Sequence, residues 1–276
     1  MTSRKHSPPA RSRRAPRRQR QTPPPGQGDA RWLYGVHAVL AALANPNRRC
    51  HRLLVAPDTA RRLGDRLAGL TSPDSSLGAE GESASRGEIA RFLPAGAVHQ
   101  GLALEVEPLP GADLKTACSP TPEGANRVVV LDGVTDPQNV GAIMRSAAAF
   151  GVRALVLTRR HAPPVTGALA KAASGALESV ALVRVNNLAR SLDALAELGY
   201  WRLGLDIAAA TPLETFRPGP AVALVLGAED TGLRRLTAGR CDELVQLPIA
   251  PLVQSLNVSH AAAIALYELA RKPLGD

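Results

Sequence analysis

From residue 127 onward, short apolar runs alternate with longer segments whose apolar residues recur at helical spacing. Short apolar runs predict strands buried on both faces, and strands that alternate with helices predict a mostly parallel sheet. We expect strands at 128–131, 154–158, 180–183, 202–205, 221–226 and 244–247. We expect helices at 139–150, 166–175, 188–198 and 259–271. The pattern therefore predicts an α/β fold whose ligands bind beyond the carboxyl ends of the strands.

The preceding part of the chain carries fewer elements. We expect helices at 34–43, 58–70 and 86–93, and strands at 52–56 and 101–106. The stretch 71–85 is rich in Ser and Gly and predicts a mobile loop, whereas 108–125 is rich in Pro and Gly and predicts a linker. These patterns predict a small α/β domain at 31–107, a linker at 108–125 and a second domain at 126–276.

Residues 1–30 contain Pro, Arg, Gln and Gly with almost no apolar side chains, which predicts a disordered tail. Eight Arg and Lys residues lie in this tail against one Asp, so most of the net charge of +9 belongs to it. Such a charge favours attraction to nucleic acid phosphates, although a solubilising extension would have the same composition.

The remaining composition excludes several classes of protein. Three cysteines lie far apart without paired spacing, which argues against a disulfide framework or a zinc site and fits a reducing cytosol. No apolar run approaches the roughly 20 residues that span a bilayer, and the N-terminus lacks the apolar core of a signal peptide. We therefore expect a cytoplasmic protein with no membrane association and no metal.

Three segments at expected strand ends carry the candidate chemistry. The first, 131–146, contains Asn139 and Arg145; the second, 224–233, contains Gly227 and Glu229; the third, 247–259, contains Asn257. A helix would set Asn139 and Arg145 about 240° apart, so they converge only if Asn139 precedes the first turn. Each segment alone would also fit a helix cap, a solvated arginine or an acidic turn.

Taken together and in this order, the three segments closely resemble the motifs of the SpoU class of SPOUT methyltransferases, over residues 127–271. The stretches 171–178 and 234–237 are also similar to this family. Upstream, 34–39 and 96–101 resemble the N-terminal domain of class members that act on guanosine in 23S rRNA. Two positions depart from the family pattern: Asp230 stands where Gly is usual, and Gln254 where a small residue is common.

The resemblance implies a fold and a set of partners. The fold would be a mostly parallel α/β sheet with a C-terminal trefoil knot, a rare exception to the absence of knots, preceded by an L30e-like RNA-binding domain. The cofactor would be S-adenosylmethionine, and the protein would be a homodimer with active sites at the subunit interface. The implied cofactor-binding residues are Leu226, Gly227, Leu247, Ile249, Ser255 and Leu256.

The resemblance also implies the reaction, which is methyl transfer to a ribose 2′-hydroxyl of ribosomal RNA. The expected target is a guanosine of 23S rRNA. The implied catalytic residues are Asn139, Arg145, Glu229 and Asn257, and the implied RNA-binding residues are His99, Gln100 and Gly101. Arg145 would orient the ribose and stabilise developing alkoxide charge, and Glu229 would hold Arg145.

Alternative functions differ in what they require of the sequence. Methylation of tRNA would use the same motifs, and a non-catalytic ribosome-assembly factor of this fold would be expected to lose their polar residues. A Rossmann enzyme or a P-loop NTPase would need GxGxxG or GxxxxGK[ST], and the sequence contains neither.

For the homodimer, we expect an interface on the C-terminal helix through Ala261, Ala262, Ile264, Ala265, Leu266 and Leu269.

Overall fold

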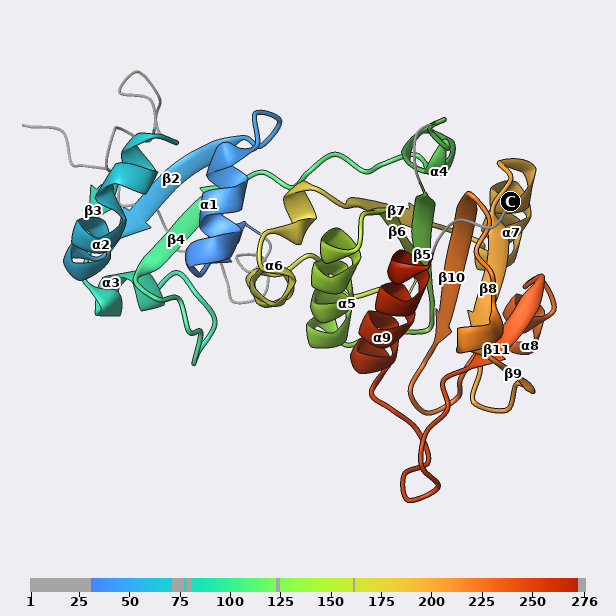
Figure 1. Ribbon diagram of the computed structural model, residues 1–276. Coiled ribbons are helices and arrows are strands. Elements are labelled where there is room, and N and C mark those ends of the chain that lie inside the picture. The colour runs from blue at the N-terminus through green and yellow to red at the C-terminus, as the bar shows by residue number, and fades with distance from the viewer. Residues whose placement is uncertain (1–30, 71–76, 78–80, 123–124, 161, 273–276) are drawn as a thin grey trace, which may run out of the picture.

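The computed structural model describes residues 31–70, 77, 81–122, 125–160 and 162–272. Two sheets organise them, one of four strands and one of seven (Figure 1). The predicted disordered tail at 1–30 lies outside the described residues, as does most of 71–80 in the predicted mobile loop. No helix in the described ranges is long and apolar enough to cross a membrane.

The seven-stranded sheet has the order β7-β6-β5-β10-β8-β11-β9, and every pairing in it is parallel. Its strands are β5 (Asn126–Asp132), β6 (Val152–Thr158), β7 (Ala181–Val185), β8 (Trp201–Leu205), β9 (Thr211–Pro212), β10 (Ala221–Gly227) and β11 (Glu243–Gln246). The predicted parallel α/β fold is therefore confirmed. The sequence pattern misses only β9, because a two-residue edge strand has no alternation to detect.

Helices cover both faces of this sheet. They are α4 (Leu114–Cys118), α5 (Pro137–Ala149), α6 (Gly167–Ala173), α7 (Leu188–Glu197), α8 (Arg235–Ala238) and α9 (Val258–Arg271), with short 3-10 turns at η1 (Ala176–Glu178) and η2 (Leu213–Thr215). Successive strand residues point to opposite faces. Val129 and Leu131 thus pack in one core with α5, α6 and α9, whereas Val128 and Val130 pack in another with α4 and α7.

The four-stranded sheet has the order β1-β4-β2-β3. Its elements are β1 (Trp32–Tyr34), α1 (Val36–Ala44), β2 (Cys50–Val55), α2 (Pro57–Ala68), β3 (Glu82–Ser83), α3 (Arg86–Ala90) and β4 (Leu102–Val106). The helix expected from residue 34 begins at Val36, because Tyr34 pairs with β4 and Gly35 has a φ of 88°. Gly35 thereby separates a strand from a helix that the apolar pattern merges.

The predicted linker at 108–125 is not irregular throughout. It contains α4, whose N-cap Asp113 accepts a hydrogen bond from the backbone amide of Thr116 at 3.1 Å. Cys118 at the end of α4 is fully buried in the core that also contains α7. Five-residue helices have too little periodicity to be seen in the sequence, so this one is found only in the structure.

The two sheets are joined by direct contacts between β1, α1, α6 and η1. A Cβ on Gly167 would lie 2.5 Å from the backbone oxygen of Trp32, so α6 approaches β1 as closely as a glycine allows. Arg48, which follows α1, forms a buried ion pair with Glu178 of η1 at 2.5 Å. Asn45 donates a further hydrogen bond to Glu178 at 2.7 Å. These contacts fix the first sheet on α6 and η1.

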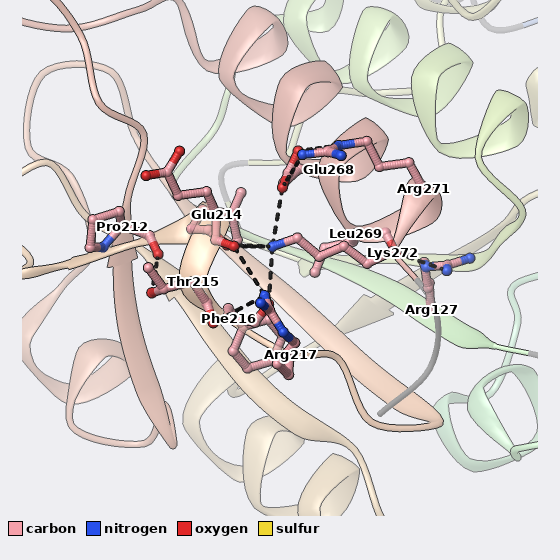
Figure 2. A network of polar contacts seen from close by, with 11 residues as sticks. Arg127, Pro212, Glu214, Thr215, Phe216, Arg217, Glu268, Leu269, Arg271 and Lys272 are labelled. Carbon is pink, nitrogen blue, oxygen red and sulfur yellow. Dashed lines mark hydrogen bonds and ion pairs between the residues drawn. The ribbon is translucent and has the colours of Figure 1, made fainter. Parts of the chain in front are cut away.

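Helix α9 is anchored at its C-terminal end by Lys272 (Figure 2). The Lys272 ammonium donates to the carbonyl oxygens of Leu213, Glu214 and Phe216 at 2.8, 2.9 and 3.0 Å. It also pairs with Glu268 one turn earlier at 3.1 Å. A cation is favourable at the negative end of a helix, and here it ties α9 to η2. The opposite end of α9 begins at Asn257, a predicted catalytic residue.

Candidate active site

Three of the four predicted catalytic residues meet at the carboxyl edge of the seven-stranded sheet. Asn139 lies in the first turn of α5, Glu229 follows β10, and Asn257 is the N-cap of α9. The amide of Asn139 donates to Glu229 at 3.0 Å, and that of Asn257 donates to Asn139 at 3.1 Å and to Glu229 at 2.5 Å. Residues up to 118 positions apart in the sequence therefore form one polar cluster, which we call the Asn–Glu–Asn cluster.

The Glu229 carboxylate is bound asymmetrically. Its Oε1 atom accepts the two asparagine amides and also the backbone amide of Val258 at 3.2 Å. Among the residues that the structure describes, none donates a hydrogen bond to Oε2. Three donors on one oxygen fix the plane of the carboxylate. The second oxygen is left available to a ligand.

Arg145 is not part of the cluster within one chain. It is exposed on α5 and forms no hydrogen bond or ion pair with a described residue. Asn139 lies inside the helix rather than before it, so the condition for the two residues to converge is not met. The two side chains therefore leave α5 in different directions, about 240° apart around the helix axis.

A buried carboxylate that sequence reasoning missed lies beside the cluster. Asp132 ends β5 at the register position opposite Gly227, and its side chain is fully buried. It accepts hydrogen bonds from the backbone amide of Arg234 at 3.0 Å and from Arg234 Nε at 2.6 Å. This pair holds the segment after Glu229 against the end of β5. An acidic residue closing an apolar strand is the signal that would have indicated it.

The predicted cofactor-binding residues lie in two connections at this same edge. Leu226 and Gly227 end β10, Leu247 and Ile249 follow β11, and Ser255 and Leu256 precede α9. Leu226 is buried, Ser255 is exposed, and the side chains of Leu247, Ile249 and Leu256 are half-buried.

Gly227 is required by the chain's own backbone. A Cβ at this position would lie 2.1 Å from the backbone carbon of Gly232 and 2.4 Å from the amide nitrogen of Leu233. Gly227 therefore allows the segment after Glu229 to pass close to the end of β10.

We expect Gly227→Ala to displace that segment, since a backbone contact this short cannot be relieved by a side-chain rotation. Calorimetry should show weaker S-adenosylmethionine binding, and limited proteolysis should show new cleavage between residues 228 and 234. Gly219→Ala is the control, because a Cβ there meets nothing within 4 Å. Unchanged binding and cleavage in Gly227→Ala would contradict this role.

The predicted RNA-binding residues form a tight turn before β4. The buried His99 accepts a hydrogen bond through Nδ1 from the amide of Gly101 at 3.2 Å. Gln100 is exposed in the left-handed region with a φ of 57°, and its Oε1 accepts from the amide of Val36 at 3.1 Å. A Cβ on Gly101 would lie 2.2 Å from Thr59 Oγ1. These contacts build the turn, and contact with RNA stays a prediction.

Burial, with a smaller contribution from Arg86, lowers the pKa of His99 below its ordinary value of 6.5. A folded-state pKa below the unfolded one means that stability is complete above pH 6.5 and is lost as the pH falls through the folded value. We expect the urea midpoint to fall between pH 7 and pH 5. His99→Asn, which keeps an acceptor for the Gly101 amide, should flatten this dependence. An equal pH dependence in both proteins would contradict the role of His99.

Comparison with known proteins shows which protein families the chain resembles. Residues 126–267 match the model of the SpoU rRNA Methylase family, and residues 32–112 match a model described as RNA 2′-O ribose methyltransferase substrate binding. No group of three or more His, Cys, Asp or Glu residues able to hold a metal occurs in the described part of the chain.

Curated relatives align over nearly their whole length. The 23S rRNA (guanosine-2′-O-)-methyltransferase RlmB of Coxiella burnetii is 38% identical over 87% of this chain and 95% of its own. RlmB of Photorhabdus laumondii is 40% identical over 87% and 97%. The structure of the SpoU methyltransferase AviRb from Streptomyces viridochromogenes with AdoMet is 25% identical, with a TM-score of 0.69 over 87% of this chain and 89% of that one. The chain thus belongs to the SpoU rRNA methylase family.

Proposed function

We propose that this protein transfers a methyl group from S-adenosylmethionine to the 2′-hydroxyl of a guanosine ribose in 23S rRNA. The observation that carries the proposal is the intact Asn–Glu–Asn cluster at the carboxyl edge of the sheet. The RlmB relatives, named for this reaction, support the substrate. A non-catalytic factor of the same fold would have no need to keep three polar side chains bonded to one another at the ligand-binding edge.

The residues at this edge fit the proposed cofactor. Leu247, Ile249 and Leu256 keep part of their apolar surface exposed, which suits an adenosine, and they lie on connections that also carry backbone donors and acceptors. When bound, S-adenosylmethionine supplies an electrophilic methyl group that needs no metal. The C-terminal trefoil knot implied by the family resemblance would hold these connections together.

The protein's part in the reaction is to position the ribose and to stabilise charge. A 2′-hydroxyl is a poor acid, so attack on the methyl group requires stabilisation of the developing alkoxide and a route for its proton. In our proposal Arg145 donates to the ribose oxygen and an adjacent phosphate through its planar guanidinium. The free Oε2 of Glu229 would orient Arg145, and Asn139 and Asn257 would fix Glu229.

This mechanism requires a second copy of the chain. Arg145 and the Asn–Glu–Asn cluster of one chain do not meet, so we propose a homodimer in which Arg145 of one protomer reaches the cluster of its partner. The expected α9 interface needs a correction. Four of the six expected residues are already buried within one chain, namely Ala262, Ala265, Leu266 and Leu269. The largest of the six that stays accessible to a partner is Ile264, with 47% of its surface exposed.

The exposed face of α9 is extended by Tyr267, which the sequence pattern did not select. Tyr267 is 56% exposed and contacts the ring of Phe150, at the end of α5, with centroids 6.2 Å apart. Helices α5 and α9 pack on each other (Figure 1), and the contact between Phe150 and Tyr267 joins their free surfaces into one patch. We propose this patch as part of the dimer interface.

Sedimentation equilibrium tests the dimer. We expect the unaltered chain to have the mass of two protomers, and Ile264→Lys to shift it toward the monomer, because a lysine would be buried without a partner. Val98→Lys is the control, since Val98 is 62% exposed on the first domain. A monomer with full methyltransferase activity would refute the shared active site.

We further propose that residues 31–107 form an L30e-like domain that binds the rRNA, that 108–125 connect it to a methyltransferase domain at 126–276, and that the protein works in the cytoplasm. The turn at His99–Gly101 would present Gln100 to the RNA. Basic residues 1–30 would add affinity through phosphates without choosing the site.

Methyl transfer in vitro tests the proposed function directly. Purified full-length protein would be incubated with methyl-labelled S-adenosylmethionine and unmodified transcripts of 23S rRNA or tRNA. We expect label in 23S rRNA as a ribose methyl that protects one phosphodiester from alkaline cleavage, because the 2′-oxygen can no longer attack. Label in tRNA alone would favour the tRNA alternative, and label on a base would contradict the proposal.

A further inference from the structure

A basic hollow of about 420 Å³ lies at the carboxyl edge of the sheet, the edge that also carries the candidate active site. Three segments form it: the end of β6, the turn from β7 into α7, and α8 with the residue before it. The residues lining it are Thr158, Arg160, Asn186, Asn187, Leu188, Ala189, Arg234, Arg235, Leu236 and Thr237. Three of them are arginines and none is acidic.

The charge of this hollow is only partly neutralised. Arg234 is paired with the buried Asp132. Arg160 and Arg235 are both exposed, and neither forms an ion pair with any residue in the described ranges. Two uncompensated guanidinium groups at one concave surface favour an anion with several acceptor oxygens, and a phosphate fits the guanidinium fork in this way.

The walls of the hollow are held in place by contacts outside it. The Arg234–Asp132 pair fixes one wall to the end of β5. Arg240, just after α8, pairs with Asp193 of α7 at 3.2 Å and so links the helices that form two of the walls. A hollow whose walls are fixed before binding loses little conformational entropy when a ligand enters.

The hollow is close to the Asn–Glu–Asn cluster along the chain. Arg234 lies five positions after Glu229 in the sequence, which limits their backbones to a separation of about 17 Å. One RNA strand can therefore contact both. We propose that Arg160 and Arg235 bind a backbone phosphate of the RNA strand that flanks the methylated nucleotide. This inference rests on the proposed function for the identity of the RNA.

The test compares Arg160→Ala, Arg235→Ala and the double variant with the unaltered full-length chain. Binding of an unmodified 23S rRNA transcript is measured at several salt concentrations. Each lost phosphate contact should reduce the slope of log affinity against log salt by roughly 0.7 to 0.9. Loss of one charge-assisted hydrogen bond should also weaken RNA binding about tenfold.

Arg217→Ala is the matched control, because Arg217 is also exposed but precedes β10 at the opposite edge of the sheet. Affinity for S-adenosylmethionine is measured alongside and should be unchanged in all variants. RNA affinities and salt slopes equal to those of Arg217→Ala would overturn the inference. So would a loss confined to cofactor affinity, which would place a carboxylate of the cofactor in the hollow.

Failure of the proposed function is distinguishable from failure of this inference. RNA binding needs no methyl transfer, so the salt slopes test the hollow even if the unaltered protein methylates another RNA. Methyl transfer by the unaltered protein with no effect of the Arg160 and Arg235 variants would leave the function standing and remove the phosphate site.

Discussion

Arg145→Ala is expected to lower the rate of methyl transfer by roughly a hundredfold or more, while the fold and S-adenosylmethionine binding are kept. A positioned cation stabilises a developing alkoxide more than a neutral hydroxyl, and such interactions are typically worth about 3 kcal/mol. The fold should survive because the Arg145 side chain is exposed and makes no ion pair with a described residue. Single-turnover kinetics on a 23S rRNA fragment, with cofactor affinity measured in parallel, would give the rate.

Two further variants separate the chemistry from charge alone. Arg145→Lys should restore little activity, because a point charge cannot reproduce the planar fork that contacts ribose and phosphate together. Arg217→Ala removes the same charge at the opposite edge of the sheet and should leave the rate near normal. Near-normal turnover in Arg145→Ala would make Arg145 a solvated surface residue and leave proton removal to water or Glu229.

The largest expected effect on stability is at Glu178. Its carboxylate accepts hydrogen bonds from Arg48 and Asn45, and the side chains of Arg48 and Glu178 are only 3% and 8% exposed. Glu178→Leu leaves the Arg48 charge buried without its partner, which typically costs about 3–5 kcal/mol. Urea unfolding of the full chain should show this loss.

A double variant makes that prediction specific. Arg48→Met combined with Glu178→Leu removes both charges and should recover most of the stability, since an apolar pair of similar volume can replace a buried ion pair. Asp58→Asn is the control at the exposed pair that Asp58 forms with Arg86, and it should have little measurable effect. Additive losses in the double variant would show that the pair is not coupled.

The sequence predicted the large sheet well because its strands are buried on both faces and read as continuous apolar runs. Two of the polar residues that it singled out, Asn139 and Asn257, gather around Glu229, since strand ends of a parallel sheet share one edge, whereas Arg145 does not. It did not predict β1, where a strand and a helix share one apolar run interrupted by Gly35. Nor did it predict α4, which is too short to show a period.

The parts of the site that could not be predicted from the sequence depend on contacts between residues far apart in the chain. Asp132 directly follows the strand expected at 128–131, and only the fold shows that it is buried and paired with Arg234. The apolar face of α9 was visible, but whether α5 or another protomer covers it cannot be read from spacing. The position of Arg145 away from Glu229 likewise depends on where α5 begins.

The measurement that tests the central claim most directly is mass spectrometric mapping of ribose methyl groups in 23S rRNA and tRNA from a strain that lacks this protein. We predict the loss of one 2′-O-methylguanosine from 23S rRNA, its return when the unaltered gene is restored, and no return with Arg145→Ala. Unchanged ribose methylation of 23S rRNA in the deletion strain would contradict the account.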